Sequence, residues 1–267
     1  MNEIQCNFYS KYLRMDTSIT VLIPSYFDEK SKDKTLGQVY DPTIKFKTLY
    51  LLHGNGGDHT NWIRYSSIER YAQKRQLAVV MPSAYVSSYS NMVHGMDYFS
   101  YLSEELPLFV RAMLPLSKKR EDNFVAGLSM GGRGAFLWAF RRPEFFAAAA
   151  CLSGSLDIDE MISRYSQENA TATLKRFEDT YGDITKIKGS DNDVYALAKK
   201  LKESGAQLPK LYMACGTEDV RHETQFKPFI AYAKQIGLDL YHEEGPGIHD
   251  FDFWDPYIAR VINWLPL

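Results

Sequence analysis

The stretch Asn123-Phe-Val-Ala-Gly-Leu-Ser-Met-Gly-Gly-Arg-Gly-Ala135 decides the fold of this chain. Its apolar start is typical of a short buried strand, and the residues from Gly131 onward favour a helix that ends at Pro143. Between strand and helix, Gly127-Leu-Ser-Met-Gly131 has the G-x-S-x-G spacing of a nucleophile elbow, a sharp turn that exposes a serine hydroxyl. The pattern therefore predicts that Ser129 is a nucleophile.

The glycines of this turn have a steric role. A serine at the tip of a strand-to-helix reversal is held at strained backbone angles, and side chains at Gly127 and Gly131 are expected to collide with the neighbouring strand and helix. The small residues that follow let the helix lie close to the sheet, with its free N–H groups directed at whatever Ser129 attacks. The alternative is a glycine-rich helix start without chemistry.

The composition fits one α/β domain. The 267 residues are 45% hydrophobic and 14% aromatic, which is enough to bury a large core. A net charge of -2 without a long basic block argues against nucleic acid or an anionic membrane as a partner.

The sequence also carries signals of location. The three scattered cysteines, Cys6, Cys151 and Cys215, are expected to be reduced packing residues. No apolar run approaches the length of a bilayer span, and the first residues lack the pattern of a signal peptide. We therefore expect a cytoplasmic protein without membrane attachment.

Short apolar runs alternate with helical patterns along most of the chain. An antiparallel pair at the sheet edge is expected from residues 4–12 and 18–23. Six buried strands are expected at residues 48–52, 77–81, 123–126, 147–152, 210–214 and 238–241. Helices are expected at residues 61–75, 98–113, 132–141, 193–204, 224–236 and 253–264. This order predicts a mainly parallel central sheet with helices on both faces, within a single domain of residues 1–267.

Two polar segments interrupt the alternation. Residues 28–41 are rich in lysine and are expected to form a surface excursion. Residues 155–192 follow the strand that ends at Ser153-Gly154, and insertions after strands commonly shape a pocket in open α/β sheets. We expect a small cap there, and a surface decoration is the alternative.

A serine nucleophile needs a base, and six histidines compete for that role. In folds with this elbow, the chain order is serine, then the acid, then histidine, each on a loop after a strand. His222 and His242 fall at an expected helix start and within the last expected strand. His249 lies in the loop Gly245-Pro-Gly-Ile-His-Asp250 after that strand, and it is the predicted base.

The acid is expected after the strand at residues 210–214. That strand leads into Cys215-Gly-Thr-Glu-Asp219, where two carboxylates follow each other. We favour Asp219 over Glu218, because a turn of this kind commonly projects its aspartate toward the histidine. Asp250 and Asp252 compete, but they stand too close to His249 in sequence to orient its ring easily.

Acyl transfer also requires N–H donors for the developing oxyanion. Met130 supplies one, because it follows the nucleophile. The second is expected from the glycine-rich loop His53-Gly-Asn-Gly-Gly-Asp58, with Asn55 as the donor and Gly54 setting the turn. His53 is expected to brace this loop and not to transfer protons.

Taken together, these motifs resemble the esterase-D-like branch of the α/β-hydrolases, with the tributyrin esterases nearest. The resemblance covers nearly the whole chain in order. It rests on His53-Gly-Asn-Gly-Gly-Asp-His-Thr-Asn-Trp62, Glu104-Glu-Leu-Pro107, Gly127-Leu-Ser-Met-Gly-Gly132, Arg141-Arg-Pro-Glu-Phe145, Leu152-Ser-Gly154 and Cys215-Gly-Thr-Glu-Asp219. It implies the α/β-hydrolase fold and a carboxylesterase for short-chain acyl esters, with Ser129, Asp219 and His249 as its triad.

The same branch contains S-formylglutathione hydrolases, carbohydrate acetylesterases and feruloyl esterases. The oxyanion loop of the first group resembles Ser-Gly-Leu-Thr-Cys, whereas His53-Gly-Asn-Gly-Gly57 stands here, so a glutathione thioester is a lesser candidate. Arg133 occupies a place where many relatives carry histidine or tyrosine. It is expected either to contact a polar leaving group or to be solvated.

The predicted reaction is hydrolysis of a small-molecule ester through an acyl-enzyme on Ser129, without a metal or an organic cofactor. An acyltransferase with the same triad is an alternative, and a non-catalytic binding module is a weaker one. Trp62, Arg133 and Trp254 are candidate substrate contacts, although core packing explains both tryptophans equally well. The sequence is compatible with a homo-oligomer.

Overall fold

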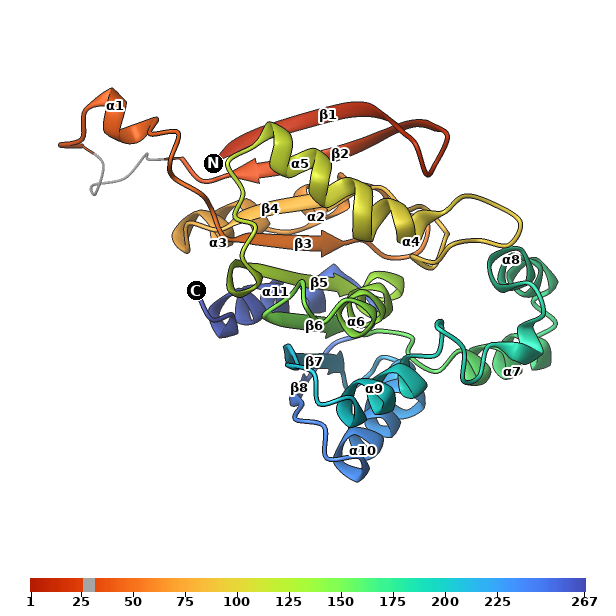
Figure 1. Cartoon of the computed structure of the whole chain (residues 1–267). Coiled ribbons are helices and arrows are strands. Elements are labelled where there is room, and N and C mark those ends of the chain that lie inside the picture. The colour runs from red at the N-terminus through yellow and green to blue at the C-terminus, as the bar shows by residue number, and fades with distance from the viewer. Residues whose placement is uncertain (26–31) are drawn as a thin grey trace.

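The computed structural model describes residues 1–25 and 32–267. In this part of the chain an eight-stranded sheet runs in the order β1-β2-β4-β3-β5-β6-β7-β8 (Figure 1). The strands are Asn2–Ser10 (β1), Met15–Ile23 (β2), Thr48–Leu52 (β3), Ala78–Pro82 (β4), Asn123–Leu128 (β5), Ala148–Leu152 (β6), Lys210–Gly216 (β7) and Tyr241–Gly245 (β8). Strands β3 to β8 are mutually parallel, whereas β1 and β2 form an antiparallel pair at one edge. The predicted mainly parallel sheet and its antiparallel edge are confirmed.

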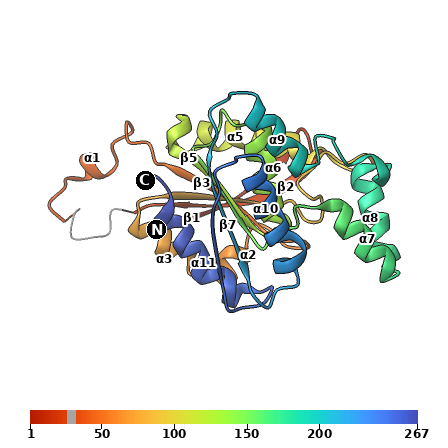
Figure 2. The ribbon, with the colours of Figure 1, turned by 90° about the horizontal axis from the view of Figure 1, so that it is seen from below.

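Helices cover both faces of the sheet. Figure 2 shows α5 and α9 on one side of it and α3 and α11 on the other. The helices are Leu36–Val39 (α1), Asn61–Tyr65 (α2), Ile68–Lys74 (α3), Tyr98–Ser100 (α4), Leu106–Met113 (α5), Met130–Arg141 (α6), Ile158–Gln167 (α7), Thr171–Tyr181 (α8), Val194–Glu203 (α9), Lys227–Gln235 (α10) and Phe251–Trp264 (α11). Because helices lie on both faces, the residues of β3 to β6 are all buried. This explains why those strands appear as unbroken apolar runs in the sequence.

Two predicted elements differ from the structure. The helix expected at residues 61–75 is two helices, α2 and α3, with a break at Ser66. The Ser66 hydroxyl accepts from the Ile68 N–H, in place of the backbone carbonyl that a continuous helix would offer, and it also donates to the Trp62 carbonyl. The strand expected at residues 238–241 was also wrong, because β8 begins at Tyr241 and runs to Gly245. At the sheet edge, β8 pairs only with β7, and its sequence is therefore polar.

The two polar segments also have defined places. Residues 28–31 of the expected surface excursion lie outside the described residues, and its later part contains the short helix α1, which projects from the sheet in Figure 1. Residues 155–192 contain α7 and α8, which lie to one side of the sheet (Figure 1). The C-terminal end of α8 is fixed to the body, since the N–H groups of Val93 and His94 donate to the carbonyls of Thr180 and Asp179.

None of the helices in the described part of the chain combines the length and apolar character required to cross a membrane.

Candidate active site

Ser129 lies at the sharp turn between β5 and α6. Its backbone angles, φ 53° and ψ -119°, fall in a region that non-glycine residues rarely adopt. A Cβ at Gly127 would stand 2.3 Å from the Gly131 carbonyl oxygen, and one at Gly131 would stand 2.5 Å from the Leu52 carbonyl oxygen. Both distances are far below contact distance. A side chain at either glycine would therefore collide with the backbone, as expected from the sequence. The Ser129 N–H donates to the Leu152 carbonyl at 2.8 Å, which fixes the strained turn to β6.

The structure brings Ser129, His249 and Asp219 together. His249 Nε2 lies 2.9 Å from Ser129 Oγ, and His249 Nδ1 lies 2.6 Å from Asp219 Oδ2. With the imidazole proton on Nδ1, His249 donates to Asp219 and accepts the hydroxyl hydrogen bond of Ser129. Asp219 follows β7, and His249 lies in the loop between β8 and α11. The three residues therefore reach one point from the carboxyl ends of separate strands.

The competing acids have other partners. Asp250 caps α11 and accepts hydrogen bonds from the N–H groups of Asp252 and Phe253. Glu218 accepts from the Gly247 N–H and from the Thr217 hydroxyl, so it is turned away from the imidazole. Among these carboxylates, Asp219 is the one hydrogen-bonded to His249.

The charge states of Asp219 and His249 suit proton transfer from Ser129. Burial acts to raise the pKa of Asp219, but hydrogen bonds from His249 and from the Arg221 N–H outweigh it, and the pKa lies below its ordinary value. Burial also lowers the pKa of His249, and its hydrogen bond to Asp219 only partly opposes that effect. At neutral pH, Asp219 is therefore a carboxylate and His249 is a neutral acceptor.

Trp254 supports the imidazole from a second side. Its ring centroid lies 4.7 Å from that of His249 in an edge-to-face arrangement, and its Nε1–H donates to Ser153 Oγ at 3.1 Å. The sequence argument missed Ser153 as a partner, because only the fold brings it to Trp254. Trp254 therefore packs against His249 and is bonded to the loop after β6.

The other two candidate substrate contacts are buried in the protein. Trp62 is 1% exposed, packs edge-on against Phe251, and donates from Nε1 to the Leu52 carbonyl. Arg133 is 2% exposed and donates to the carbonyls of Ser88 and Asn192. The expectation of a solvated Arg133 was wrong, because the guanidinium joins two distant loops instead of facing water.

The loop after β3 lies against the nucleophile. A Cβ built on Gly54 would stand 2.7 Å from Leu128 Cδ1 and 3.6 Å from Ser129 Cβ, so any larger residue would intrude on the elbow. Asn55 is the next residue of this loop. Met130 is the first residue of α6, where a backbone N–H has no partner within its own helix.

His53 holds this loop in place. Its Nε2 accepts from the Ala84 N–H at 2.8 Å, so its proton is on Nδ1, which donates to the Gly54 carbonyl at 2.6 Å. Burial lowers the pKa of His53 to about 4. The imidazole is therefore neutral and fully hydrogen-bonded, as expected for a brace.

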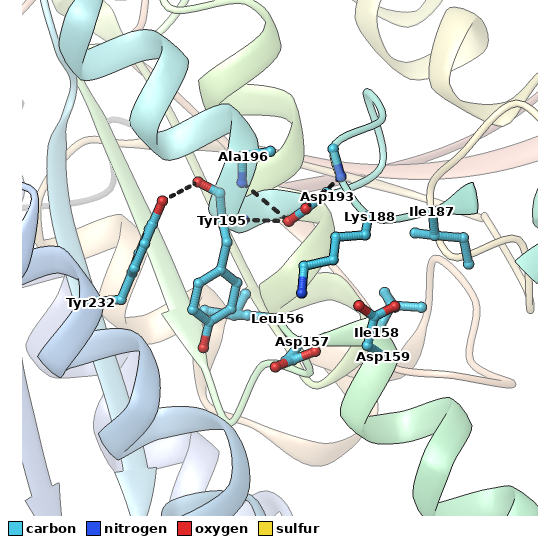
Figure 3. A pocket seen from close by; sticks show the side chains of 11 residues that line it. Leu156, Asp157, Ile158, Asp159, Ile187, Lys188, Asp193, Tyr195, Ala196 and Tyr232 are labelled. Atoms are coloured by element: carbon cyan, nitrogen blue, oxygen red, sulfur yellow. Dashed lines mark hydrogen bonds between the residues drawn. The ribbon is translucent and has the colours of Figure 1, made fainter. Parts of the chain in front are cut away.

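A cavity of about 410 Å³ opens where the segment of residues 155–192 meets α9 and α10 (Figure 3). Apolar side chains such as Leu156, Ile187 and Tyr195 line it, together with Asp157, Asp159 and Lys188. Ser129, Asp219 and His249 do not line this cavity. Among residues 1–25 and 32–267, no group of three or more His, Cys, Asp or Glu side chains is placed to hold a metal ion.

Comparison with known proteins identifies the family. The family model Esterase, described as "Putative esterase", matches residues 29–264. An acetyl esterase of Caldicellulosiruptor saccharolyticus is 34% identical over 264 residues, which cover 98% of this chain and 97% of the relative.

Solved structures agree with that result. FphF, a fluorophosphonate-binding serine hydrolase of Staphylococcus aureus, is 35% identical with a TM-score of 0.84, over 99% of this chain and 98% of that chain. FrmB, an S-formylglutathione hydrolase from the same species, is 35% identical with a TM-score of 0.83 over the same shares. A ferulic acid esterase with 18% identity and a TM-score of 0.76 shares the fold.

The family model and the acetyl esterase both cover most of the chain, and the serine hydrolase structures match its fold from end to end. The chain therefore belongs to the Esterase family of esterase-D-like α/β-hydrolases and is a serine carboxylesterase.

Proposed function

We propose that Ser129 is the nucleophile of this esterase, with His249 as its general base and Asp219 as the acid that orients the base. One observation carries the proposal, the continuous hydrogen-bonded line from Asp219 through His249 to Ser129 Oγ. Ser129 Oγ attacks the ester carbonyl carbon while its proton passes to His249 Nε2. The Asp219 carboxylate stabilises the imidazolium that forms.

The tetrahedral intermediate carries a negative charge on the former carbonyl oxygen. We propose that the backbone N–H groups of Met130 and Asn55 donate to this oxygen. Collapse of the intermediate expels the alcohol, which takes the proton from His249 and leaves an acyl-enzyme. Water, deprotonated by the same histidine, then releases the acid and regenerates the hydroxyl.

The proposed substrates are short-chain acyl esters, with acetyl esters first. The acetyl esterase relative, 34% identical over nearly the full chain, supports this choice. A thioesterase acting on S-formylglutathione is the second candidate, because a solved structure of that name is 35% identical. Carbohydrate acetylesterase, feruloyl esterase and acyltransferase activities remain alternatives for the same triad.

The test is the variant Ser129→Ala, assayed with p-nitrophenyl acetate and with a fluorophosphonate probe. Loss of both hydrolysis and labelling, with an unchanged melting temperature, is the expected result. Full activity of Ser129→Ala would overturn the proposal. For the wild type, p-nitrophenyl esters from acetate to octanoate, S-formylglutathione, methyl ferulate and acetylated xylan would rank the substrates, and product analysis with an added alcohol would detect acyl transfer.

We further propose that residues 1–267 form one domain, in which residues 155–192 are a cap, and that the enzyme works in the cytoplasm. The buried, unpaired thiols of Cys151 and Cys215 are compatible with a reducing compartment. Whether the enzyme forms a homo-oligomer is a question for sedimentation measurements.

A further inference from the structure

Arg221 contacts the proposed acid of the triad on the side away from His249. Asp219 divides its two carboxylate oxygens: Oδ2 faces His249, and Oδ1 faces Arg221. The Arg221 N–H donates to Oδ1 at 3.0 Å, and its guanidinium Nη1 lies 3.6 Å from the same oxygen. The Asp219 side chain is fully buried and that of Arg221 is 16% exposed, so little water competes for these contacts.

The guanidinium is itself fixed by Ser155. Arg221 Nε donates to Ser155 Oγ at 3.0 Å, and Ser155 is 5% exposed. Ser155 is the first residue of the segment that leaves the sheet after β6. A long arginine side chain loses rotamer freedom when its guanidinium is bound, and the bond to Ser155 keeps the charge beside Asp219.

The same turn makes a second attachment to this segment. One helical turn after Arg221, Gln225 is 1% exposed and its Oε1 accepts from the Asp157 N–H at 2.7 Å. Its Nε2 donates to the Asp157 carbonyl at 3.3 Å. The residues that follow Asp219 are thus bound at two points to the start of residues 155–192.

We propose that the Arg221 guanidinium is a positioning group, which holds the Asp219 carboxylate in line with His249 and ties it to Ser155; the backbone N–H bond of Arg221 to Asp219 is kept in every variant below. This inference rests on the proposed function, since it concerns the same triad. Arg221 touches neither Ser129 nor the imidazole in the hydrogen bonds of the described residues, so it acts through Asp219.

Arg221 also acts on the base through its charge. The charged groups that face His249 are Asp219, Asp250 and Arg221, and the positive charge of Arg221 opposes protonation of the imidazole. Replacing it with a neutral residue therefore raises the pKa of His249. Because the neutral imidazole is the active form, activity is then lost at a higher pH as the solution is acidified.

The experiment compares Arg221→Gln, Arg221→Lys and Ser155→Ala with the wild type, using p-nitrophenyl acetate between pH 5 and 9. Arg221→Gln is expected to lower kcat about 10-fold, below the 10²–10⁴-fold contribution of a general base, with KM nearly constant. The acidic limb of its kcat/KM profile moves to higher pH. Arg221→Lys keeps the charge and loses the bond to Ser155, so the acidic limb of its profile stays in place. Its kcat is expected to fall less than that of Arg221→Gln and by the same factor as that of Ser155→Ala, which loses the same bond.

Arg142→Gln is the matched control, because Arg142 also pairs with a carboxylate two residues away, Glu144, but on the surface. It should match the wild type in kcat, KM and pH profile. The inference is overturned if Arg221→Gln keeps the wild-type kcat and pH profile. It is also overturned if the lost activity equals the fraction of Arg221→Gln that melting curves show to be unfolded.

Fluorophosphonate labelling separates this result from a failure of the proposed function. The inference predicts that Arg221→Gln is labelled completely but more slowly than the wild type. If the wild type is not labelled at Ser129, the triad assignment fails. If the wild type is labelled and Arg221→Gln reacts at the same rate, only the role of Arg221 fails.

Discussion

Ser129 Oγ and His249 Nε2 lie 2.9 Å apart, although 120 residues separate them in the chain. Their meeting depends on the sheet, in which β5 is separated from β8 by β6 and β7, all parallel. Parallel strands direct their carboxyl ends to one edge, where the loops after them converge. This hydrogen bond therefore depends on the register of four strands as well as on the positions of the two side chains.

The tautomer of His249 is the first property that can be tested. In Asp219→Asn, the amide nitrogen can donate to Nδ1, which shifts the imidazole proton to Nε2 and removes the acceptor for Ser129. We expect kcat to fall about 10⁴-fold, as for the corresponding change in a serine protease, with KM and stability nearly unchanged. Glu218→Gln is the control and should lose little activity. A larger loss in Glu218→Gln than in Asp219→Asn would show that the acid was misassigned.

The close approach of α6 to β3 makes a stability prediction. In Gly131→Ala, the new Cβ would stand 2.5 Å from the carbonyl oxygens of Leu52 and His53, which are backbone atoms that cannot rotate away. The variant is expected to lose about 3 kcal/mol of unfolding free energy in urea titrations, the upper end of the usual cost of overpacking. Gly37→Ala is the control, because a Cβ there meets no atom within 4 Å. Equal stability of both variants would be inconsistent with the described elbow.

The elbow and the meeting of Ser129, Asp219 and His249 were predictable because each depends on a local pattern. Glycines at fixed spacing around Ser129, and single polar residues after apolar runs, mark the carboxyl ends of strands. The roles of Arg133 and Trp254 were not predictable in this way. Arg133 bonds Ser88 and Asn192, and Trp254 bonds Ser153, and these partners are brought near only by the folded chain.

The bounds of the strands also differ in how well the sequence predicts them. The buried strands were recognisable from their apolar runs, but β8 is polar because it has a neighbour on one side only. The apolar pattern of residues 238–241 predicts that strand, whereas Leu238 is a buried residue after α10 whose N–H donates to the Ala233 carbonyl. An apolar residue thus indicates burial without indicating which element buries it.

His53 predicts how stability depends on pH. Its pKa is about 4 in the folded protein, against 6.5 for an ordinary histidine, so the unfolded chain binds a proton more readily. This contribution to stability is complete above pH 6.5 and is lost as the pH falls toward 4, by about 3 kcal/mol in total. Urea titrations of His53→Gln should therefore show a shallower loss of stability across that range than the wild type. The exposed His94→Gln is the control, and a wild-type slope in His53→Gln would contradict the prediction.

The contribution of the proposed oxyanion donor, the Asn55 backbone N–H, can be measured separately from that of the Asn55 side chain. A backbone N–H survives in Asn55→Ala, so this variant is expected to keep kcat within a few-fold of the wild type. Asn55→Pro removes the N–H and should lower kcat about 10²–10³-fold, the usual cost of one oxyanion donor. KM should change little, because the donor binds the transition state more strongly than the ester.

Both variants need melting curves, since proline also restricts Gly54, whose position against Leu128 leaves no room for a shift. A loss in Asn55→Ala as large as that in Asn55→Pro would assign the role to the side-chain amide. A folded Asn55→Pro with wild-type kcat would remove this residue from the oxyanion hole and leave Met130 as the donor to be tested.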